Sequence, residues 1–237
     1  KRVRSVLSVL EPALGARAAD MRRSVSAAAR LLAGARDADA AAASARELRA
    51  AAGATEHAGL DRVVASLAAA AADAHHRAPP VEEVRRRLAA IEASLAEAGD
   101  DIDGKALFAA ALRRSYRKGR HAMARAEASL STPDLHRWRK WVKDLWHLLA
   151  LAEKHLPRIG DADRDELVLL GEILGQDHDH AILAEKLALS PEGDPALMRQ
   201  LGLIARERRR LELEAFTLGA RLYGRKAKRF AKRAKVR

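Results

Sequence analysis

No stretch of this 237-residue chain alternates apolar and polar residues in the way that a β-strand on a sheet surface requires. Ala, Leu, Arg and Glu dominate the sequence, whereas β-branched residues are scarce and aromatic residues make up only 3%. Ala and the straight-chain residues are the strongest helix formers. We therefore expect an all-α protein, and the Gly and Pro breakers divide it into about eight to ten helices.

The chain is long enough for two helical units of about 120 residues, each able to bury its own core. The segment GDDIDG at 99–104 is the one place where Gly and acidic residues cluster without apolar periodicity. A junction there predicts a first helical-bundle repeat at residues 1–100 and a second at residues 101–237. Gly175 is expected to break a further helix.

Two pairs of segments, one member of each pair in either half, align with each other. Residues 1–7 (KRVRSVL) lie on residues 140–146 (KWVKDLW), with the basic and aliphatic positions in step. Residues 31–37 (LLAGARD) lie on residues 173–179 (ILGQDHD), so that an Arg-Asp doublet matches a His-Asp doublet. These matches indicate an internal repeat.

The repeat has two consequences for the fold. We expect two antiparallel helical bundles with long helices, related by a pseudo-twofold axis. In addition, the residues that match 135–139 would precede Lys1. The opening of the first repeat is therefore expected to be missing.

The charge balance restricts the class of partner. The 44 Lys and Arg outnumber the 32 Asp and Glu, which gives a formal charge of +12 and a pI near 10.5. Such an excess is typical of proteins that meet phosphates or acidic surfaces. The chain has no Cys, which excludes disulfides and thiol chemistry. It also lacks a signal peptide or an apolar run of about 20 residues, so we expect a soluble, cytoplasmic protein with no membrane partner.

One face of the predicted helix at 135–157 carries nitrogen donors. At about 100° per residue, a narrow stripe contains His136, Lys140, Lys143, His147 and Lys154. The opposite face contains Trp138, Val142, Leu145, Leu149 and Ala152. Donors that repeat about every 5.4 Å suit a linear phosphate chain, which offers only acceptor oxygens. A solvated face is the alternative, although such faces usually mix acidic and basic residues.

Two other predicted helices carry basic rows. In the segment at 104–126, Arg113, Arg117 and Arg120 follow each other at i, i+4 and i+7. The last long helix carries Arg206, Arg210 and Arg221. Nine Lys or Arg then occupy residues 221–237 without one acidic residue, and a frayed basic tail is an alternative for that stretch.

Asp177, His178, Asp179 and His180 stand together after a Gly. A His-Asp doublet is typical of metal-dependent helical phosphohydrolases, but such sites need further ligands from other helices. The repeat matches His178 with Arg36, a residue type that binds phosphate and not metal. Anion contact is the favoured role for His178, and a structural cap or packed side chain and metal ligation stay open as alternatives.

No Walker loop, GxGxxG turn, GxSxG elbow or HExxH helix occurs in the chain. No pair of carboxylates stands in an evidently catalytic setting either. We therefore expect no enzymatic activity, no cofactor and no bound metal.

Several strings resemble the CHAD family, the conserved histidine α-helical domain often found beside CYTH triphosphatases. They are LHRWRKWVKDLWHLL, LGEILGQDHDHAIL, LRRSYRKGRHAMARA and TLGARLYGRKAKRFAKR in the second half, and KRVRSVLSVLEPALG and ARLLAGARDADA in the first. The resemblance implies two pseudo-symmetric helical bundles whose basic residues line a shared surface or channel for inorganic polyphosphate.

The resemblance also implies which residues bind the phosphate chain. They are Lys1, Arg4 and Arg36 in the first repeat, His136, Arg139, Lys140, Lys143 and His178 in the second, and Arg113, Arg117, Arg120, Arg206, Arg210, Arg221, Tyr223 and Lys226 on the flanking basic helices. His147, on the basic stripe, stands where the family leads us to expect a Tyr. The Ala-rich segment at 39–51 is also less distinctive than the family pattern.

The leading hypothesis is a non-catalytic, polyphosphate-binding module of the cytoplasm, located at polyphosphate granules and partnered by, or fused to, a CYTH-type triphosphatase. The first alternative is a protein that binds nucleic-acid backbones, which the few aromatic residues and the lack of a recognition signature disfavour. The others are a metal-dependent phosphohydrolase centred on His178 and Asp179, and a scaffold that docks on an acidic protein.

Overall fold

The computed structural model of the protein describes residues 2–52, 57–79, 81–96, 103–151, 161–188 and 195–233, with the backbone alone for 57–58, 161–163, 195–196 and 231–233. The helices in these ranges are α1 (Arg2–Leu14), α2 (Ala16–Leu31), α3 (Ala33–Ala51), α4 (His57–His76), α5 (Val81–Ala96), α6 (Gly104–Ser129), α7 (Thr132–Leu151), α8 (Asp161–Ala188), α9 (Pro195–Tyr223) and α10 (Ala227–Arg233). The described ranges contain no strand, so the all-α prediction is confirmed. None of these helices combines the length and apolar character needed to cross a bilayer.

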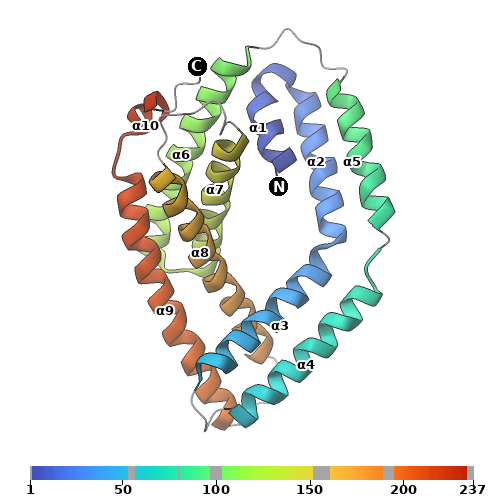
Figure 1. The fold of residues 1–237 in the computed structure, drawn as a ribbon, viewed down its shortest axis with the longest axis vertical. Helices are drawn as coiled ribbons and strands as arrows, with labels where there is room; N and C mark the ends of the chain where they lie inside the picture. The colour runs from blue at the N-terminus through green and yellow to red at the C-terminus, as the bar shows by residue number, and fades with distance from the viewer. Residues whose placement is uncertain are drawn as a thin grey trace.

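The helices form two columns that meet at both ends (Figure 1). One column contains α6, α7, α8 and α9, and the other contains α1, α2 and α5, while α3 and α4 cross toward the lower ends of α8 and α9. At the lower end α3 packs on α8 and α4 on α9, and at the upper end α1 packs on α6 and α7. The two predicted units, 1–100 and 101–237, therefore share an interface, although the residues of the predicted junction lie mostly outside the described ranges.

Polar contacts join the two halves at the upper end. Ser5 of α1 donates a hydrogen bond to Asp144 Oδ1 of α7 at 3.0 Å. Arg114 of α6 donates from Nη2 to the backbone oxygen of Ser8 at 2.6 Å and to its Oγ at 3.2 Å. These bonds fix the place of α1 against the second half.

The largest core belongs to α6–α10, where Trp138 and Tyr116 are the largest fully buried side chains. The Tyr116 hydroxyl donates to the backbone oxygens of Leu222 at 2.8 Å and Arg225 at 2.9 Å. Its ring stacks on Phe230 of α10, with centroids 4.3 Å apart. Tyr116 therefore ties the end of α9 and the start of α10 to α6.

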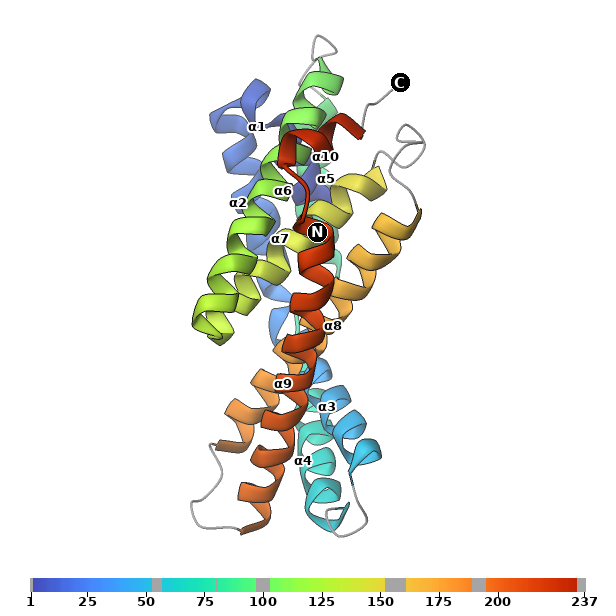
Figure 2. The same cartoon turned by 90° about the vertical axis from the view of Figure 1, so that its left-hand side faces the viewer.

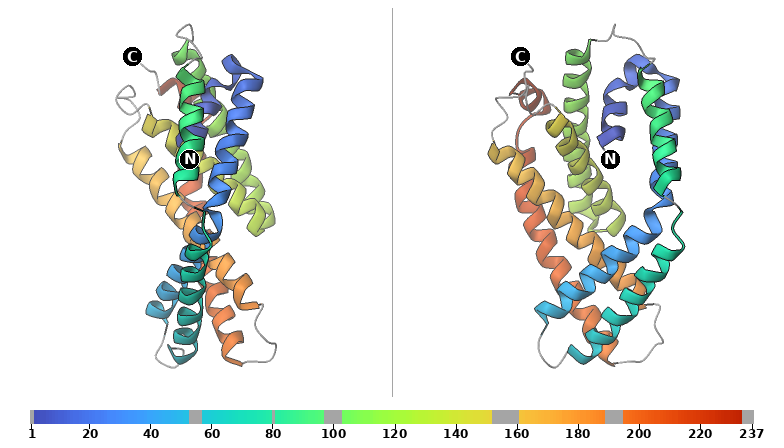
Figure 3. Two further views of the ribbon diagram at one scale, coloured as in Figure 1. Left: turned by 90° about the vertical axis from the view of Figure 1, so that its right-hand side faces the viewer. Right: turned by 45° about the vertical axis from the view of Figure 1, so that its right-hand side comes forward.

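Smaller apolar clusters lie outside this core in the described residues. In the lower part of Figure 2, α3 and α4 lie beside the lower parts of α8 and α9, and the apolar cluster there consists of Ala45, Leu48, Leu60, Leu183, Leu187 and Ile204. Figure 3 shows α5 alongside α2, where the buried cluster consists of Leu7, Met21, Val25 and Ile91. The first half thus buries fewer and smaller side chains than the second.

The expected helix break at Gly175 is wrong, because α8 runs without interruption through this position. Gly175 serves a close approach instead: a Cβ there would lie 3.3 Å from Nη2 of Arg139. The segment of the first half that aligns with this stretch does break, at Leu32 between α2 and α3. The aligned segments therefore differ in continuity, and the internal repeat and its twofold axis stay predictions.

Candidate polyanion-binding site

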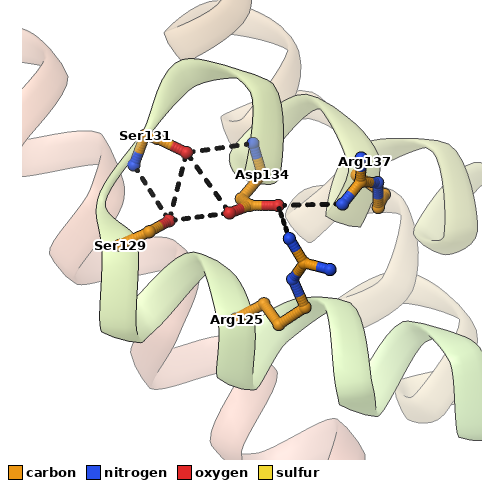
Figure 4. Close-up of polar contacts among 5 residues, drawn as sticks. All are labelled: Arg125, Ser129, Ser131, Asp134 and Arg137. Atoms are coloured by element: carbon orange, nitrogen blue, oxygen red, sulfur yellow. Dashed lines mark hydrogen bonds and ion pairs between the residues drawn. The ribbon is translucent and has the colours of Figure 1, made fainter.

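The start of α7 is fixed by a local network of hydrogen bonds (Figure 4). Ser131 Oγ accepts from the backbone N–H of Asp134 at 3.4 Å and donates to Asp134 Oδ2 at 3.3 Å, which caps the helix. Arg125 and Arg137 each reach Asp134 Oδ1 at 3.1 Å. The hydrogen bond from Ser129, and then these two cations, hold the pKa of Asp134 below its usual value. The network fixes the first turn of α7 and thereby sets the phase of the basic stripe that follows.

A buried ion pair holds the first turn of α7 against α8 and α9. Arg208 of α9 donates from Nε to Asp177 Oδ1 of α8 at 2.8 Å, and from Nη2 to Thr132 Oγ1 of α7 at 3.2 Å. The side chain of Asp177 is 3% exposed. Because one guanidinium bonds to two helices from a third, it fixes their relative positions next to His178.

Charged side chains of three helices meet at the place where α3 packs on α8. We call this group the three-helix cluster; it consists of Arg36 and Asp37 of α3, His136, Arg139 and Lys143 of α7, and His178 and Asp179 of α8. The rings of His136 and His178 lie 4.5 Å apart between centroids. The first and second halves of the chain both contribute residues to it.

The cations of the three-helix cluster have lost part of their hydration. Burial lowers the pKa of Arg139, the nearby Arg36 lowers it further, and Asp179 and Asp37 oppose the shift. Burial, and then the charge of Arg139, also lower the pKa of Lys143. In the described residues, Nε of Arg139 is buried without a hydrogen-bond partner. A cation that is partly desolvated beside other cations gains most from an added anion.

His178 shares this environment. Burial and then Arg139 lower the pKa of His178, while Asp37, Asp177 and other carboxylates raise it. Its Nδ1 is buried and finds no hydrogen-bond partner among the described residues. The side chain as a whole is half-buried, so its protonation would add a positive charge to the cluster.

The two doublets that the repeat alignment matched lie in this one cluster. Arg36 and Asp37 begin α3, and the charges of both act on Asp179 of α8, while Asp37 also acts on His178. The sequence predicted equivalent roles for Arg36 and His178. The structure adds that the two residues face one shared site from opposite halves of the chain.

The other predicted basic residues are distributed over the surface. Arg113, Arg117 and Arg120 lie on the exposed face of α6 and have no carboxylate partner among the described residues. By contrast, Arg86 and Arg87 of α5 both pair with Glu83. The α6 row therefore differs from an ordinary solvated helix face, in which the charges compensate each other.

On α9 and at the termini the placement is mixed. Arg210 forms ion pairs with Glu207 at 2.6 Å and with Glu214 at 3.1 Å. Arg221 forms an ion pair with Glu166 at 3.3 Å. Of the remaining predicted positions, Lys140, Arg206 and Lys226 are exposed and Arg4 is half-buried, whereas Lys1 and Lys154 lie outside the described residues.

Two predicted contact residues lie in the core. Tyr223 is 3% exposed, its ring packs on Tyr116 at 5.2 Å between centroids, and burial raises its pKa. His147 is 8% exposed, and its ring lies 4.6 Å from that of Trp146 between centroids. Because a surface-bound chain cannot reach buried side chains, we do not include Tyr223 and His147 in the candidate site.

The sequence interpretation missed the contributions of Asp37 and Arg208. Asp37 could have been found, because the repeat alignment matches it with Asp179. Nothing in the sequence distinguishes Arg208 from its basic neighbours on α9, since its partners come from two other helices. Such a long-range pair is visible only once the helices are placed.

Other kinds of site are a metal centre and a groove. In the described ranges, no three His, Asp or Glu side chains are grouped so that they could hold a metal ion. A groove of about 430 Å³ runs along the contact between α2 and α5, away from the three-helix cluster, and its lining includes Arg17, Asp20, Arg87 and Ser94.

Comparison with known proteins identifies the class to which this fold and site belong. The family model of the CHAD domain matches residues 1–188, which is most of the chain. The chain therefore belongs to the CHAD domain family. No curated protein and no solved structure shows a significant match to it.

Proposed function

We propose that the protein binds inorganic polyphosphate at the three-helix cluster and does not transform it. The observation that carries this proposal is the convergence of Arg36, Arg139 and His178 from both halves of the chain, where Arg36 is exposed and Arg139 and His178 are half-buried. Partly desolvated cations of this kind are stabilised by an anion that brings several charges at once.

The surroundings of the cluster favour an extended anion. Lys140 is exposed on the basic stripe beside Lys143, and the α6 row offers further uncompensated cations. Donors repeat along both helices at about one turn, or about 5.4 Å, which suits a linear chain with acceptor oxygens along its whole length. Membership of a family linked to polyphosphate binding supports the same ligand.

Single-stranded nucleic acid fits this surface less well. Its bases need exposed aromatic platforms on which to stack. Trp138 is fully buried, and Trp141 and Trp146 pack against the largest core. Duplex backbones make no such demand, so duplex DNA is the appropriate competitor in a binding experiment.

The binding experiment is calorimetry with long-chain polyphosphate at near-physiological salt. The triple variant His136→Ala, Lys140→Ala, Lys143→Ala should weaken binding at least about tenfold, because each lost phosphate contact also loses counterion release. The matched control is the triple variant Arg85→Ala, Arg86→Ala, Arg87→Ala on α5, whose cations pair with Glu82 and Glu83. Equal losses in both variants, or displacement by duplex DNA at equal phosphate concentration, would contradict the proposal.

The remaining parts of the proposal have separate tests. We expect the purified protein to release no orthophosphate from polyphosphate and to contain no stoichiometric metal; turnover together with bound metal would instead support a phosphohydrolase at His178 and Asp179. Localisation at polyphosphate granules is tested by fluorescence microscopy of tagged protein. Partnership with a CYTH-type triphosphatase is tested by co-purification.

A further inference from the structure

Helix α6 carries charges of one sign over most of its length. Between Gly104 and Ala126 the sequence contains seven Lys or Arg and no Asp or Glu. The α6 row consists of Arg113, Arg117 and Arg120, which are exposed and have no carboxylate partner among the described residues. Like charges one turn apart destabilise a helix, so an anion bound along the row would offset a repulsion already present.

The α6 row points away from the core of α6–α10. Arg117 precedes Ala126 by nine residues, or about two and a half turns, so the two side chains lie on opposite faces of α6. Ala126 is fully buried in that core. Arg113 and Arg120 lie one turn before and one turn after Arg117 and share its outward face.

Exposed cations of α10 lie close to the row. Figure 2 shows α10 across the upper part of α6. Phe230 of α10 stacks on Tyr116, which directly precedes Arg117, with ring centroids 4.3 Å apart. Lys228 and Arg229, the two residues before Phe230, are exposed. Two helices therefore contribute cations to this outer face.

The three-helix cluster lies on another side of the molecule. At the start of α7, Asp134 faces α6, because Arg125 of α6 reaches its Oδ1 at 3.1 Å (Figure 4). Lys143 of the cluster follows Asp134 by nine residues and so lies on the opposite side of α7 from this contact. A phosphate chain held at the cluster would therefore have to leave it and turn round the α6–α7 pair to reach the α6 row.

We propose that the α6 row is a second polyanion-binding surface that holds a different polyphosphate strand from the one at the three-helix cluster, so that one molecule bridges two strands. This inference rests on the proposed function, because the cluster must hold the first strand. Two phosphate strands repel each other, and a protein with cations on two faces compensates both charges where the strands approach. Looping a single chain round the protein costs chain entropy, so a nearby second strand is the favoured occupant of the row.

The test is a bridging assay with two preparations of long-chain polyphosphate, one fixed to beads and one carrying a fluorescent label. The two chains are mixed with increasing amounts of protein, and the label on the beads is measured. We expect the wild-type protein to recruit the labelled chain, with a maximum at intermediate protein concentration, because excess protein saturates each strand separately.

The decisive variant is Arg113→Gln, Arg117→Gln, Arg120→Gln. It should recruit at least about fivefold less labelled chain, whereas capture of the protein itself by the beads should fall by no more than about threefold, because the cluster still holds the first strand. The matched control is Arg85→Gln, Arg86→Gln, Arg87→Gln on α5, which removes the same formal charge from cations that pair with Glu82 and Glu83. It should recruit the labelled chain as the wild type does, and circular dichroism establishes that both variants are folded.

The outcomes separate bridging from the function on which it rests. If the beads capture the wild-type protein but no labelled chain follows, bridging is wrong and polyphosphate binding stands. Equal losses in the α6 and α5 variants would assign bridging to overall charge and contradict a role for the row. Full recruitment by the α6 variant, as from a dimer that presents two clusters, would contradict it as well. If the beads capture no wild-type protein, both the bridging and the proposed function are wrong.

Discussion

The two halves of the molecule are held together in different ways. In the second half, α6–α10 bury large side chains such as Trp138 and Tyr116 in one continuous core. In the first half, α3 and α4 meet partly through Ala38, Ala42 and Ala71, which bury little area each. Because the second half has the larger core, it supplies the platform against which the first half docks.

This difference matters for the candidate site, which lies between the halves. The α7 and α8 members of the three-helix cluster are held by the densely packed core and by the Arg208–Asp177 pair. Arg36 and Asp37 take their places because α3 packs on α8 and α1 packs on α6 and α7. We therefore expect that destabilising the first half would displace Arg36 and Asp37 and leave the α7 and α8 members of the cluster in place.

The largest expected effect concerns the cores themselves. Trp138→Ala should lower the free energy of unfolding by about 3–5 kcal/mol, because it leaves a large cavity among fully buried neighbours. Ile91→Ala in α5 should cost about 2 kcal/mol, at the low end for such changes, because α5 packs chiefly on α2 and can shift to close the gap.

Urea unfolding followed by circular dichroism measures both free energies, and hydrogen exchange shows which helices lose protection. Ile91→Ala should speed exchange in α1, α2 and α5 while α6–α9 keep their protection. Equal costs for the two variants, or uniform loss of protection in the second, would contradict the comparison of the halves.

The next prediction concerns ion pairs of the two halves. Arg208→Ala should cost about 3 kcal/mol, because it leaves the buried carboxylate of Asp177 without its partner. The matched variant Arg49→Ala removes the exposed Arg49–Asp61 pair between α3 and α4, and should leave the free energy of unfolding almost unchanged. Thermal and urea unfolding of the two variants check the contrast, and similar costs would show that Asp177 finds water or another donor.

Binding of long-chain polyphosphate should tighten about tenfold as the pH falls from about 8 to about 5.5. His178 has a pKa lowered mainly by burial, so it is neutral at the upper pH, and a bound phosphate would favour its protonation. Asp179 has a raised pKa and so loses its charge at a higher pH than an ordinary Asp. Both changes add positive charge as the pH falls. The groups that face these two residues are Arg36 and Asp37 of α3, His136, Arg139 and Lys143 of α7, and Asp177, His180 and Glu185 of α8.

Calorimetry in buffers of different ionisation enthalpy measures the proton uptake directly. His178→Gln should reduce both the uptake and the pH dependence. If affinity is the same at the two pH values, the protonation of this histidine is not coupled to binding.

The smallest effect is expected at the upper contact between the halves. Ser5 is buried and donates to Asp144, so Ser5→Ala should cost about 1 kcal/mol, the usual value for a lost hydrogen bond. Hydrogen exchange should increase in α1 before it increases in α7. A variant as stable as the wild type would mean that apolar packing alone holds α1 in place.

Local sequence patterns predicted the features that depend on neighbouring residues, such as helix formation. The helical class followed from composition, and the presence of a long helix after residue 134 followed from its helical periodicity. The break at Gly175 was wrong because a Gly inside a helix is also used for close approach, and its neighbour Arg139 comes from another helix. Helical periodicity likewise placed His147 on the basic stripe, but it could not show that the fold buries this side chain.

The candidate site was predicted in part. The basic stripe and the match between Arg36 and His178 were visible in the sequence, although their meeting in one cluster was not. The contributions of Asp37 and Arg208 depend on partners at least 31 residues away or on a neighbouring helix. Tyr223 was included because the family resemblance implied a phosphate contact, but the fold buries its ring against Tyr116.

The most direct test of the account is a double-mutant cycle across the two halves, with Arg36→Gln and Arg139→Gln measured singly and together for long-chain polyphosphate binding. We expect each single variant to lose about tenfold in affinity, and the double variant to lose clearly less than the product of the two losses, because both cations serve one stretch of bound chain. Losses that multiply independently, or no loss for Arg36→Gln, would contradict a single site built by both halves.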